Sequence, residues 1–299
     1  MRYDAIVVGG GPAGLAGALY LARFRRSVLV VDEGRGRAAR IPRSHNVAGF
    51  PDGVAGGRLI AAMREQAAGH GAEWAAGRVS KIAPDGAGGF EVAWGRRRAG
   101  ARSVLLATGA SDRPPPMPYL ADALRRGALR YCPVCDGYEA SGQRVGVLAD
   151  GEHGAREALY LRHFSPQVTL FGLQGHLALA PATRRALARA GIVRVDAPLD
   201  SLRLWKGAVI ARHGPGQTTC DTMYCALGMV VHSELATALG ARHDAAGYLV
   251  TDRHQCTSVA GLYAAGDVVQ GLNQISVALG AAAVAASAMH RALARDRAA

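Results

Sequence analysis

The sequence AIVVGGGPAG at residues 5–14 carries the clearest structural signal in this chain. Residues 5–8 form a short apolar run typical of a buried strand, and the glycines that follow predict a tight turn. A helical stretch then extends to about residue 23, and a second apolar run, SVLVVD at residues 27–32, ends in an acid. A strand, a helix and a second strand in this order form a β-α-β unit, which builds parallel sheets.

The glycine spacing in this unit predicts a dinucleotide site. Gly9 permits the tight turn, Gly11 lets the backbone approach a pyrophosphate, and Gly14 lets the helix pack closely on the strand. The start of the helix offers free N–H groups and the positive end of its dipole to that phosphate. Asp32, at the end of the second strand, is placed to accept hydrogen bonds from a ribose. The residues expected to contact the cofactor here are Gly9, Gly11, Pro12, Ala13, Gly14 and Asp32.

The rest of the chain predicts a second unit of the same kind, inserted in the first. With 299 residues the chain is long enough for two domains. A proline cluster at residues 114–118 indicates a linker, and another β-α-β unit follows at residues 144–171. We therefore expect an α/β fold with two Rossmann-like dinucleotide-binding domains. Residues 1–116 and 243–299 would form the first domain, and residues 117–242 the second.

Composition and charge exclude several classes of protein. Hydrophobic residues make up 49% of the chain and charged residues 19%, which rules out a wholly disordered chain. The net charge is +12, but the basic residues are mostly scattered arginines without interleaved aromatics, so we expect no nucleic-acid binding. The longest nearly apolar run, residues 275–289, is short and rich in alanine, so we expect no membrane span. The sequence shows no export signal, which favours a cytoplasmic location.

The five cysteines, an odd number, favour redox or metal chemistry over a structural disulfide framework. The pair in CPVCDG at residues 132–137 has the spacing of a small redox-active disulfide. The alternative is half of a zinc site, completed by Cys220 and Cys225. Because Cys225 lies in an apolar strand without the short loop of a zinc knuckle, we expect no metal. Cys220, Cys225 and Cys256 are expected to pack as small hydrophobic residues.

Several motifs together resemble the low-molecular-weight thioredoxin reductase family, FAD-dependent pyridine nucleotide-disulfide oxidoreductases with two dinucleotide-binding domains. These motifs are GGGPAG at residues 9–14, ATG at 107–109, CPVCDG at 132–137, TSV at 257–259 and AAGD at 264–267. The resemblance covers nearly the whole chain and implies a homodimer and a reactive dithiol. It also implies that residues 1–116 and 243–299 form an FAD-binding domain, and that residues 117–242 form an NAD(P)-binding-like domain that carries the cysteine pair. The further FAD contacts that it implies are Asn46, Gly109, Gly266, Asp267 and Gln274.

The resemblance also implies a role for each residue of the redox turn. Cys135 would face the flavin and exchange electrons with it, and Cys132 would attack the disulfide of a partner. Asp136 would move protons as the thiolates form. The implied activity is that of an FAD-dependent disulfide oxidoreductase that passes electrons between FAD and a Cys132–Cys135 disulfide. Its partner would be a thioredoxin-like protein or a small-molecule dithiol or disulfide.

The predicted nicotinamide-nucleotide site departs from the family pattern. Its glycine loop, ADGEHG at residues 149–154, starts with an alanine and contains two acids. Where the family has basic residues for the 2′-phosphate, the sequence is GLQGH at residues 172–176. A phosphate monoester without a cationic partner loses its main source of affinity. We therefore expect NADPH or NADH to bind weakly, with little preference between them.

This departure leaves the direction of electron flow open. One alternative is a dithiol oxidase, in which a substrate dithiol is oxidised at the cysteine pair and O₂ reoxidises FAD. Another is a non-enzymatic flavin redox sensor, against which the intact thiol pair and Asp136 argue.

Overall fold

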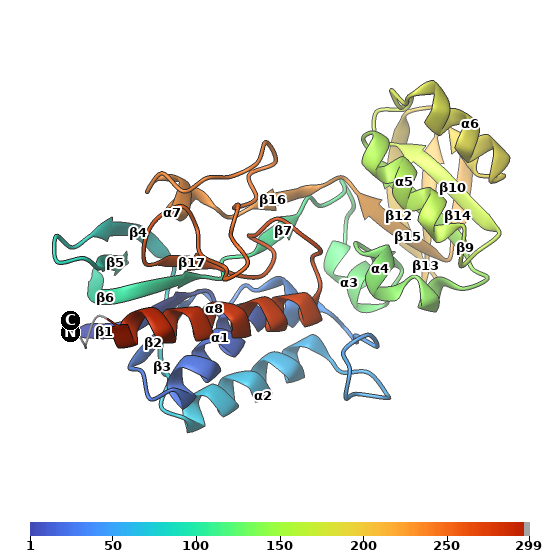
Figure 1. The fold of residues 1–299 in the computed structure, drawn as a ribbon. Helices are drawn as coiled ribbons and strands as arrows, with labels where there is room; N and C mark the ends of the chain where they lie inside the picture. The colour runs from blue at the N-terminus through green and yellow to red at the C-terminus, as the bar shows by residue number, and fades with distance from the viewer. Residues whose placement is uncertain (296–299) are drawn as a thin grey trace. The chain divides into compact units, whose positions relative to one another are not determined.

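The computed structural model describes residues 1–295, and the chain folds into two compact units. The first unit comprises Met1–Arg43, Val47–Ser111 and the chain from Val231 onward; the second comprises Ser44–Asn46 and Asp112–Val230. The chain passes between them through strands β7 (Ala110–Asp112) and β16 (Met229–Val231), which pair with each other (Figure 1). The C-terminal bound expected for the insert, residue 242, lies beyond Val230 of the second unit, and helix α7 (Glu234–Thr237) between these positions packs on strand β4 of the first unit.

The first unit is built on a seven-stranded sheet with the order β3-β2-β1-β6-β5-β4, in which β17 also pairs with β6. The strands β1, β2, β3, β6 and β17 run parallel, whereas β4, β5 and β6 form an antiparallel ribbon. Their bounds are β1 (Arg2–Val8), β2 (Val28–Asp32), β3 (Glu73–Ala76), β4 (Val79–Pro84), β5 (Phe90–Trp94), β6 (Arg97–Leu106) and β17 (Leu262–Ala264). The ends of β1 and β6 are in register at Val8 and Leu106, so the turns that follow both strands lie at the same edge.

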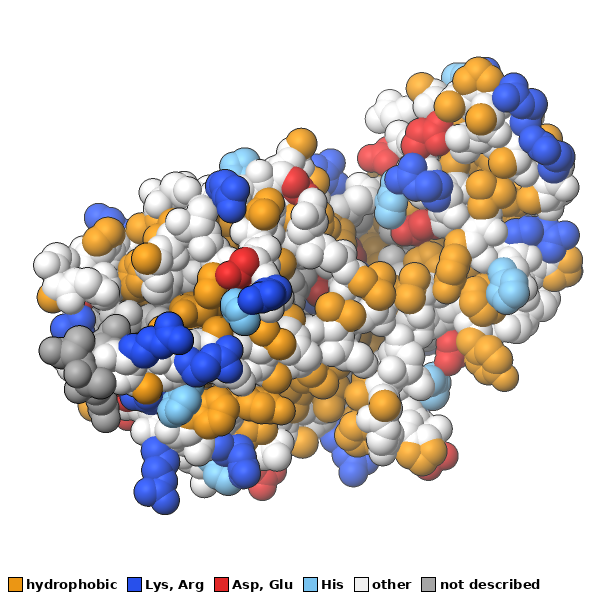
Figure 2. All heavy atoms as spheres, viewed as in Figure 1, with side chains coloured by type: hydrophobic (Ala, Val, Ile, Leu, Met, Phe, Trp, Pro, Cys, Tyr) orange, Lys and Arg blue, Asp and Glu red, His pale blue; other side chains and the backbone are white. Residues whose placement is uncertain are grey.

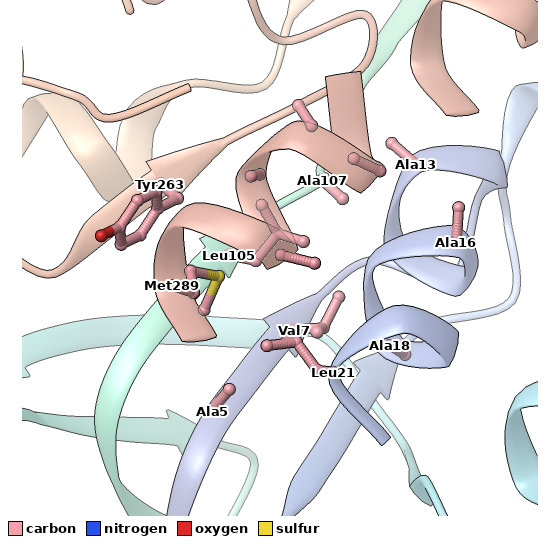
Figure 3. Packing of buried hydrophobic residues seen from close by; sticks show 14 of the residues in the cluster. Ala5, Val7, Ala13, Ala16, Ala18, Leu21, Leu105, Ala107, Tyr263 and Met289 are labelled. Atoms are coloured by element: carbon pink, nitrogen blue, oxygen red, sulfur yellow. The ribbon is translucent and has the colours of Figure 1, made fainter. Parts of the chain in front are cut away.

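Small residues let the helices of the first unit pack closely. Helix α8 (Ile275–Arg295) lies against α1 (Pro12–Arg23), and both cover the sheet around Val7 and Leu105 (Figure 3). The helix continues six residues past the apolar run expected at 275–289, so its 21 residues are long and apolar enough to cross a membrane by length and composition. In this structure its alanine face is instead part of the core of the first unit. The unit also contains η1 (Arg37–Arg40) and α2 (Gly56–Gly69).

The second unit has a five-stranded parallel sheet with the order β11-β10-β9-β15-β8. Its bounds are β8 (Leu129–Arg130), β9 (Arg144–Ala149), β10 (Gln167–Gly172), β11 (Val193–Val195) and β15 (Thr222–Ala226). An antiparallel sheet, β12 (Leu199–Trp205), β13 (Ala208–His213) and β14 (Gly216–Cys220), adds buried residues such as Leu202 and Val209 to its core. The helices are α3 (Leu120–Arg125), α4 (Pro133–Asp136), η2 (Tyr138–Ala140), α5 (Glu152–Leu161) and α6 (Pro181–Arg189). Each unit thus has the parallel, Rossmann-like sheet that the sequence predicts.

Candidate active site

The three glycines of the first loop differ in what surrounds them. Gly9 has a φ of +105°, and a Cβ there would overlap the Ala107 carbonyl oxygen, so only glycine fits. A Cβ on Gly14 would overlap the Gly9 carbonyl oxygen, because α1 packs directly on the loop. A Cβ on Gly11 would meet no atom within 4 Å. The backbone at Gly11 and the start of α1 therefore face open space, which fits the approach of a pyrophosphate.

Asp32 holds the glycine loop in place. Its Oδ1 accepts a hydrogen bond from the Gly10 N–H at 2.9 Å, and its Oδ2 accepts one from the Gly34 N–H at 3.0 Å. Each carboxylate oxygen keeps a further lone pair for a hydroxyl group. The contact of Asp32 with a ribose stays a prediction, and its position at the loop is compatible with it.

A second acid lies beside the start of α1. Gly266 follows β17, and a Cβ on it would stand 2.9 Å from the Ala13 Cβ, so the turn that carries Asp267 abuts the first turn of α1. Arg37 Nη1 lies 3.4 Å from Asp267 Oδ2. Sequence reasoning did not single out Arg37, because it is one of several arginines in a polar loop. A cation at this place suits a site for a pyrophosphate.

The other FAD contacts implied by the resemblance lie at three places. Gly109 follows β6, and its carbonyl oxygen accepts a hydrogen bond from the His232 N–H at 3.0 Å. Gln274 directly precedes α8. Asn46 accepts a hydrogen bond from the Ser44 hydroxyl at 2.9 Å, in the short segment that belongs to the second unit. Their cofactor roles stay predictions.

Cys132 and Cys135 are joined in a disulfide at the start of α4. Cys132 is the N-cap of this helix, and its sulfur accepts a hydrogen bond from the Cys135 N–H at 3.2 Å. Two apolar side chains beside the disulfide are exposed, Val134 by 45% and Tyr138 by 80%. Val134 lies between the two cysteines in the sequence, and Tyr138 follows Cys135 by three residues.

The remaining cysteines are not arranged as redox or metal partners of this pair. Cys220 and Cys225 are buried, and burial raises the pKa of each thiol to about 12. Over residues 1–295, no group of three or more His, Cys, Asp or Glu side chains is arranged to hold a metal ion. The disulfide also engages the two sulfurs that the zinc alternative would need.

Asp136, the last residue of α4, is held by two side chains that sequence reasoning missed. Tyr224 donates a hydrogen bond to Asp136 Oδ1 at 2.9 Å, and Arg130 Nη1 lies 3.0 Å from Oδ2. Burial raises the pKa of Asp136, and the Arg130 charge and the Tyr224 hydrogen bond oppose this only in part. Tyr224 is 88 residues away in the sequence, so no local pattern marks the contact.

The second glycine loop packs like a dinucleotide-binding loop, but the helix that follows it carries a carboxylate in its first turn. A Cβ on Gly154 would overlap the Ala149 Cβ, so α5 packs closely on the end of β9. Glu152, in the first turn of α5, accepts hydrogen bonds from the Ala180 N–H and the Thr183 hydroxyl, which lower the pKa of its carboxyl group. Arg184, an arginine that follows β10 in the sequence, donates a hydrogen bond to the Leu179 carbonyl oxygen at 2.6 Å.

The sequence and the fold match one family of enzymes. A family model described as pyridine nucleotide-disulphide oxidoreductase matches residues 3–282. The thioredoxin reductase of Treponema pallidum is 32% identical over 297 residues, covering 96% of this chain and 95% of that protein. The thioredoxin reductase of Bacillus subtilis is 29% identical, with coverages of 96% and 93%.

Solved structures agree with this match. The crystal structure of HlmI superimposes with a TM-score of 0.91 at 31% identity, covering 99% of this chain and 93% of that one. The thioredoxin reductase of Streptococcus pyogenes gives 0.90 at 28% identity, covering 98% and 99%. The chain therefore belongs to the pyridine nucleotide-disulfide oxidoreductases. Within them it is a thioredoxin-reductase-like, FAD-dependent disulfide oxidoreductase, as its motifs indicate.

Proposed function

We propose that the protein passes electrons between FAD and the Cys132–Cys135 disulfide, and through this pair to or from a substrate dithiol or disulfide. The disulfide at the start of α4, whose two cysteines are half-buried, carries the proposal. FAD, which supplies two-electron redox chemistry when bound, would be held by the glycine loop, Asp32 and Asp267 together with the other residues named above. Cys135 would exchange electrons with it.

The exchange with substrate is a pair of thiol–disulfide steps. The Cys132 thiolate attacks one sulfur of the substrate disulfide, and the other substrate sulfur leaves as a thiolate and takes up a proton. The Cys135 thiolate then attacks Cys132 Sγ, which re-forms the enzyme disulfide and releases the second substrate thiol. The same steps in reverse oxidise a substrate dithiol. Asp136 would supply and accept the protons that the thiols gain and lose.

The proposed partner is a thioredoxin-like protein or a small-molecule dithiol or disulfide. The exposed apolar side chains of Val134 and Tyr138 support a partner that contacts this turn. Lys and Arg side chains stand in separate small groups on the face shown in Figure 2, which supports the expectation that nucleic acid is not the partner. The packing of α8 into a core supports the expectation of no membrane span. A homodimer rests on the resemblance alone, and a cytoplasmic location stays an expectation from the sequence.

A second candidate function is supported by the second glycine loop. The carboxylate in the first turn of α5 and the lack of Lys or Arg at residues 172–176 disfavour a nicotinamide nucleotide as electron donor. In a dithiol oxidase, the substrate dithiol loses two electrons and two protons through the cysteine pair and FAD, and O₂ takes them up as hydrogen peroxide. A non-enzymatic redox sensor gains no support, because the chain belongs to an enzyme family.

One experiment distinguishes the two directions of electron flow, from a nicotinamide nucleotide to the disulfide or from a dithiol to FAD. FAD-loaded protein is mixed without oxygen with NADPH, NADH or a small dithiol such as dithiothreitol, and the flavin absorbance is followed. Bleaching by the dithiol that is lost in Cys132→Ser supports exchange through the cysteine pair. Bleaching by dithiol but only slowly by either nucleotide favours the oxidase. A dithiol reaction that is unchanged in Cys132→Ser would overturn the proposed function.

A further inference from the structure

We infer that Arg130 and Tyr224 are positioning residues that fix the carboxylate of Asp136, the residue after Cys135, and set the pH range in which it exchanges protons with the thiols. The inference rests on the proton-transfer role proposed for Asp136. It adds two residues, from strands outside the redox turn, that act through that carboxylate.

The two contacts engage both oxygens of the carboxylate. The Tyr224 hydroxyl lies 2.9 Å from Asp136 Oδ1 and 2.9 Å from the Asp136 carbonyl oxygen, so its single proton is shared between the side chain and the backbone of one residue. Arg130 Nη1 lies 3.0 Å from Oδ2 on the other side. Rotation of the carboxylate would break at least one of these contacts. Asp136 is therefore held in one orientation next to Cys135.

The two positioning side chains come from a rigid part of the second unit. Arg130 on β8 and Tyr224 on β15 are register partners in adjacent parallel strands. Tyr224 is fully buried, and a buried tyrosine hydroxyl needs a hydrogen-bond partner. Arg130 Nε is anchored by the Gly127 carbonyl oxygen at 3.1 Å and the Thr222 hydroxyl at 3.2 Å. Side chains from two strands of the sheet thus hold the carboxylate that α4 carries.

Burial and the charged groups around Asp136 shift its pKa in opposite directions. Burial raises the pKa of Asp136, and the Glu139 carboxylate raises it further, whereas Arg130 and Tyr224 lower it. Glu139 is in turn paired with His45, whose Nδ1 lies 2.8 Å from Oε1. If Arg130 is removed, burial and Glu139 act with little opposition, and Asp136 takes up its proton at a higher pH. If the Glu139 charge is removed, the shift has the opposite sign.

The test measures thiol reactivity, which does not need turnover. The FAD-loaded protein is reduced, and the rate of alkylation by iodoacetamide is followed from pH 4 to pH 10. A change in alkylation rate with pH that is present in the unmodified protein and absent from Asp136→Asn is the step that reports the protonation of Asp136. We expect Arg130→Gln to move that step upward by about one to three pH units, the effect of an opposite charge a few ångströms away. Tyr224→Phe should move it upward by less, and Glu139→Gln should move it downward.

Matched variants separate this role from a general effect on folding. Arg126→Gln removes an arginine from an exposed pair with Asp122 in the same unit and should leave the step in place. Arg130→Lys keeps the positive charge and should bring the step back toward its position in the unmodified protein. In the Asp136→Asn background, Arg130→Gln should cause no pH shift of its own.

Two outcomes would overturn the inference, and they are distinguishable. If Asp136→Asn removes the step but Arg130→Gln and Tyr224→Phe leave it in place, the two residues do not position the carboxylate, and the role of Asp136 stands. If Asp136→Asn leaves the profile unchanged, the role of Asp136 fails and the inference fails with it. The proposed disulfide exchange is tested separately, by Cys132→Ser.

Discussion

The carboxylate of Glu152 accepts a hydrogen bond from the hydroxyl of Thr183, with Oε2 and Oγ1 2.8 Å apart. The Ala180 N–H binds its other oxygen, and the two bonds keep the pKa of Glu152 below its ordinary value, so the side chain is ionised at neutral pH. A negative charge is therefore fixed in the first turn of α5. The start of a helix would otherwise attract a phosphate.

NADPH and NADH should reduce the flavin slowly and at similar rates. The extra charge of the 2′-phosphate needs a cationic partner, and residues 172–176 offer none. The net charge of +12 does not replace it, because distant surface charges are screened beyond about 8–10 Å in physiological salt. Stopped-flow absorbance of the flavin measures both rates. Fast, saturable reduction by micromolar NADPH would contradict this prediction and remove the main support for the oxidase.

Glu152→Gln should increase the rate of flavin reduction by either nucleotide at a concentration below saturation. The gain should be about two- to fivefold, because a charge in the first turn of a helix is worth about 0.3–1 kcal/mol. Glu91→Gln, which removes an exposed acid of the first unit, is the matched control and should change nothing. An equal gain in both variants would show that only the overall charge matters.

Cys132→Ser and Cys135→Ser should each abolish disulfide exchange while FAD stays bound. The thiolates carry the exchange and have no role in the glycine loop. Turnover of a disulfide substrate and the flavin spectrum measure the two properties independently. Cys256→Ser changes a cysteine of the first unit and should keep full turnover. Activity that survived in both Cys132→Ser and Cys135→Ser would remove the catalytic assignment.

Gly11→Ala and Gly14→Ala should separate cofactor binding from folding. A methyl group on Gly14 overlaps the Gly9 carbonyl oxygen, so Gly14→Ala should destabilise the FAD-free protein by about 1–3 kcal/mol. A methyl group on Gly11 meets no protein atom, and its φ of −78° suits alanine, so the FAD-free protein should keep its stability. Gly11→Ala should nevertheless bind FAD more weakly, because the methyl group occupies the approach of the pyrophosphate.

Thermal unfolding with and without FAD measures both effects of these glycine variants. The assignment of the loop would be wrong if Gly11→Ala bound FAD as tightly as the unmodified protein does. It would also be wrong if the two variants lost equal stability without FAD.

Asp267→Ala and Arg37→Gln should each yield protein with much less flavin. The two side chains lie 3.4 Å apart next to the turn that abuts α1, where the ribityl chain and pyrophosphate of FAD are expected. The ratio of flavin to protein after gel filtration is the measurement. Arg40→Gln, in the same short helix, removes an exposed arginine and should keep the flavin. A fully loaded Asp267→Ala protein would refute the proposed role of this acid.

Local patterns in the sequence predicted the parallel core of both units. Strand, glycine turn and helix at residues 2–23 and 144–161 follow directly from apolar runs and glycine spacing, and their ends differ from expectation by a few residues. The antiparallel sheet formed by β12, β13 and β14 was not anticipated, although local signals are present. Its first two strands contain apolar residues, LDSLRLW in β12 and AVIARH in β13. The first turn, at Lys206 and Gly207, has positive φ values of 48° and 84°, and the second turn contains Gly214 and Pro215.

The contacts that tune the candidate site could not be predicted in this way. Arg37 and Asp267 are 230 residues apart, and Tyr224 and Asp136 are 88 apart. Each pair joins elements that are distant in the sequence, η1 with the turn after β17 and α4 with β15, and a single sequence does not specify such tertiary contacts. Glycine and cysteine motifs show where the chemistry is, whereas the residues that orient the motifs are ordinary arginines and a tyrosine in a core strand.

The assembly of the first unit from distant segments has a consequence for biosynthesis. The chain of the second unit from Asp112 to Val230 leaves the ribosome as one continuous stretch, and domains generally fold as units during translation. The sheet of the first unit, by contrast, lacks β17, and α1 lacks the covering helix α8, until residues 262–295 have been made. Asp267, the proposed flavin contact, belongs to that stretch. A newly made chain can therefore complete residues 112–230, which carry the redox disulfide, before the segment with Asp267 has been synthesised.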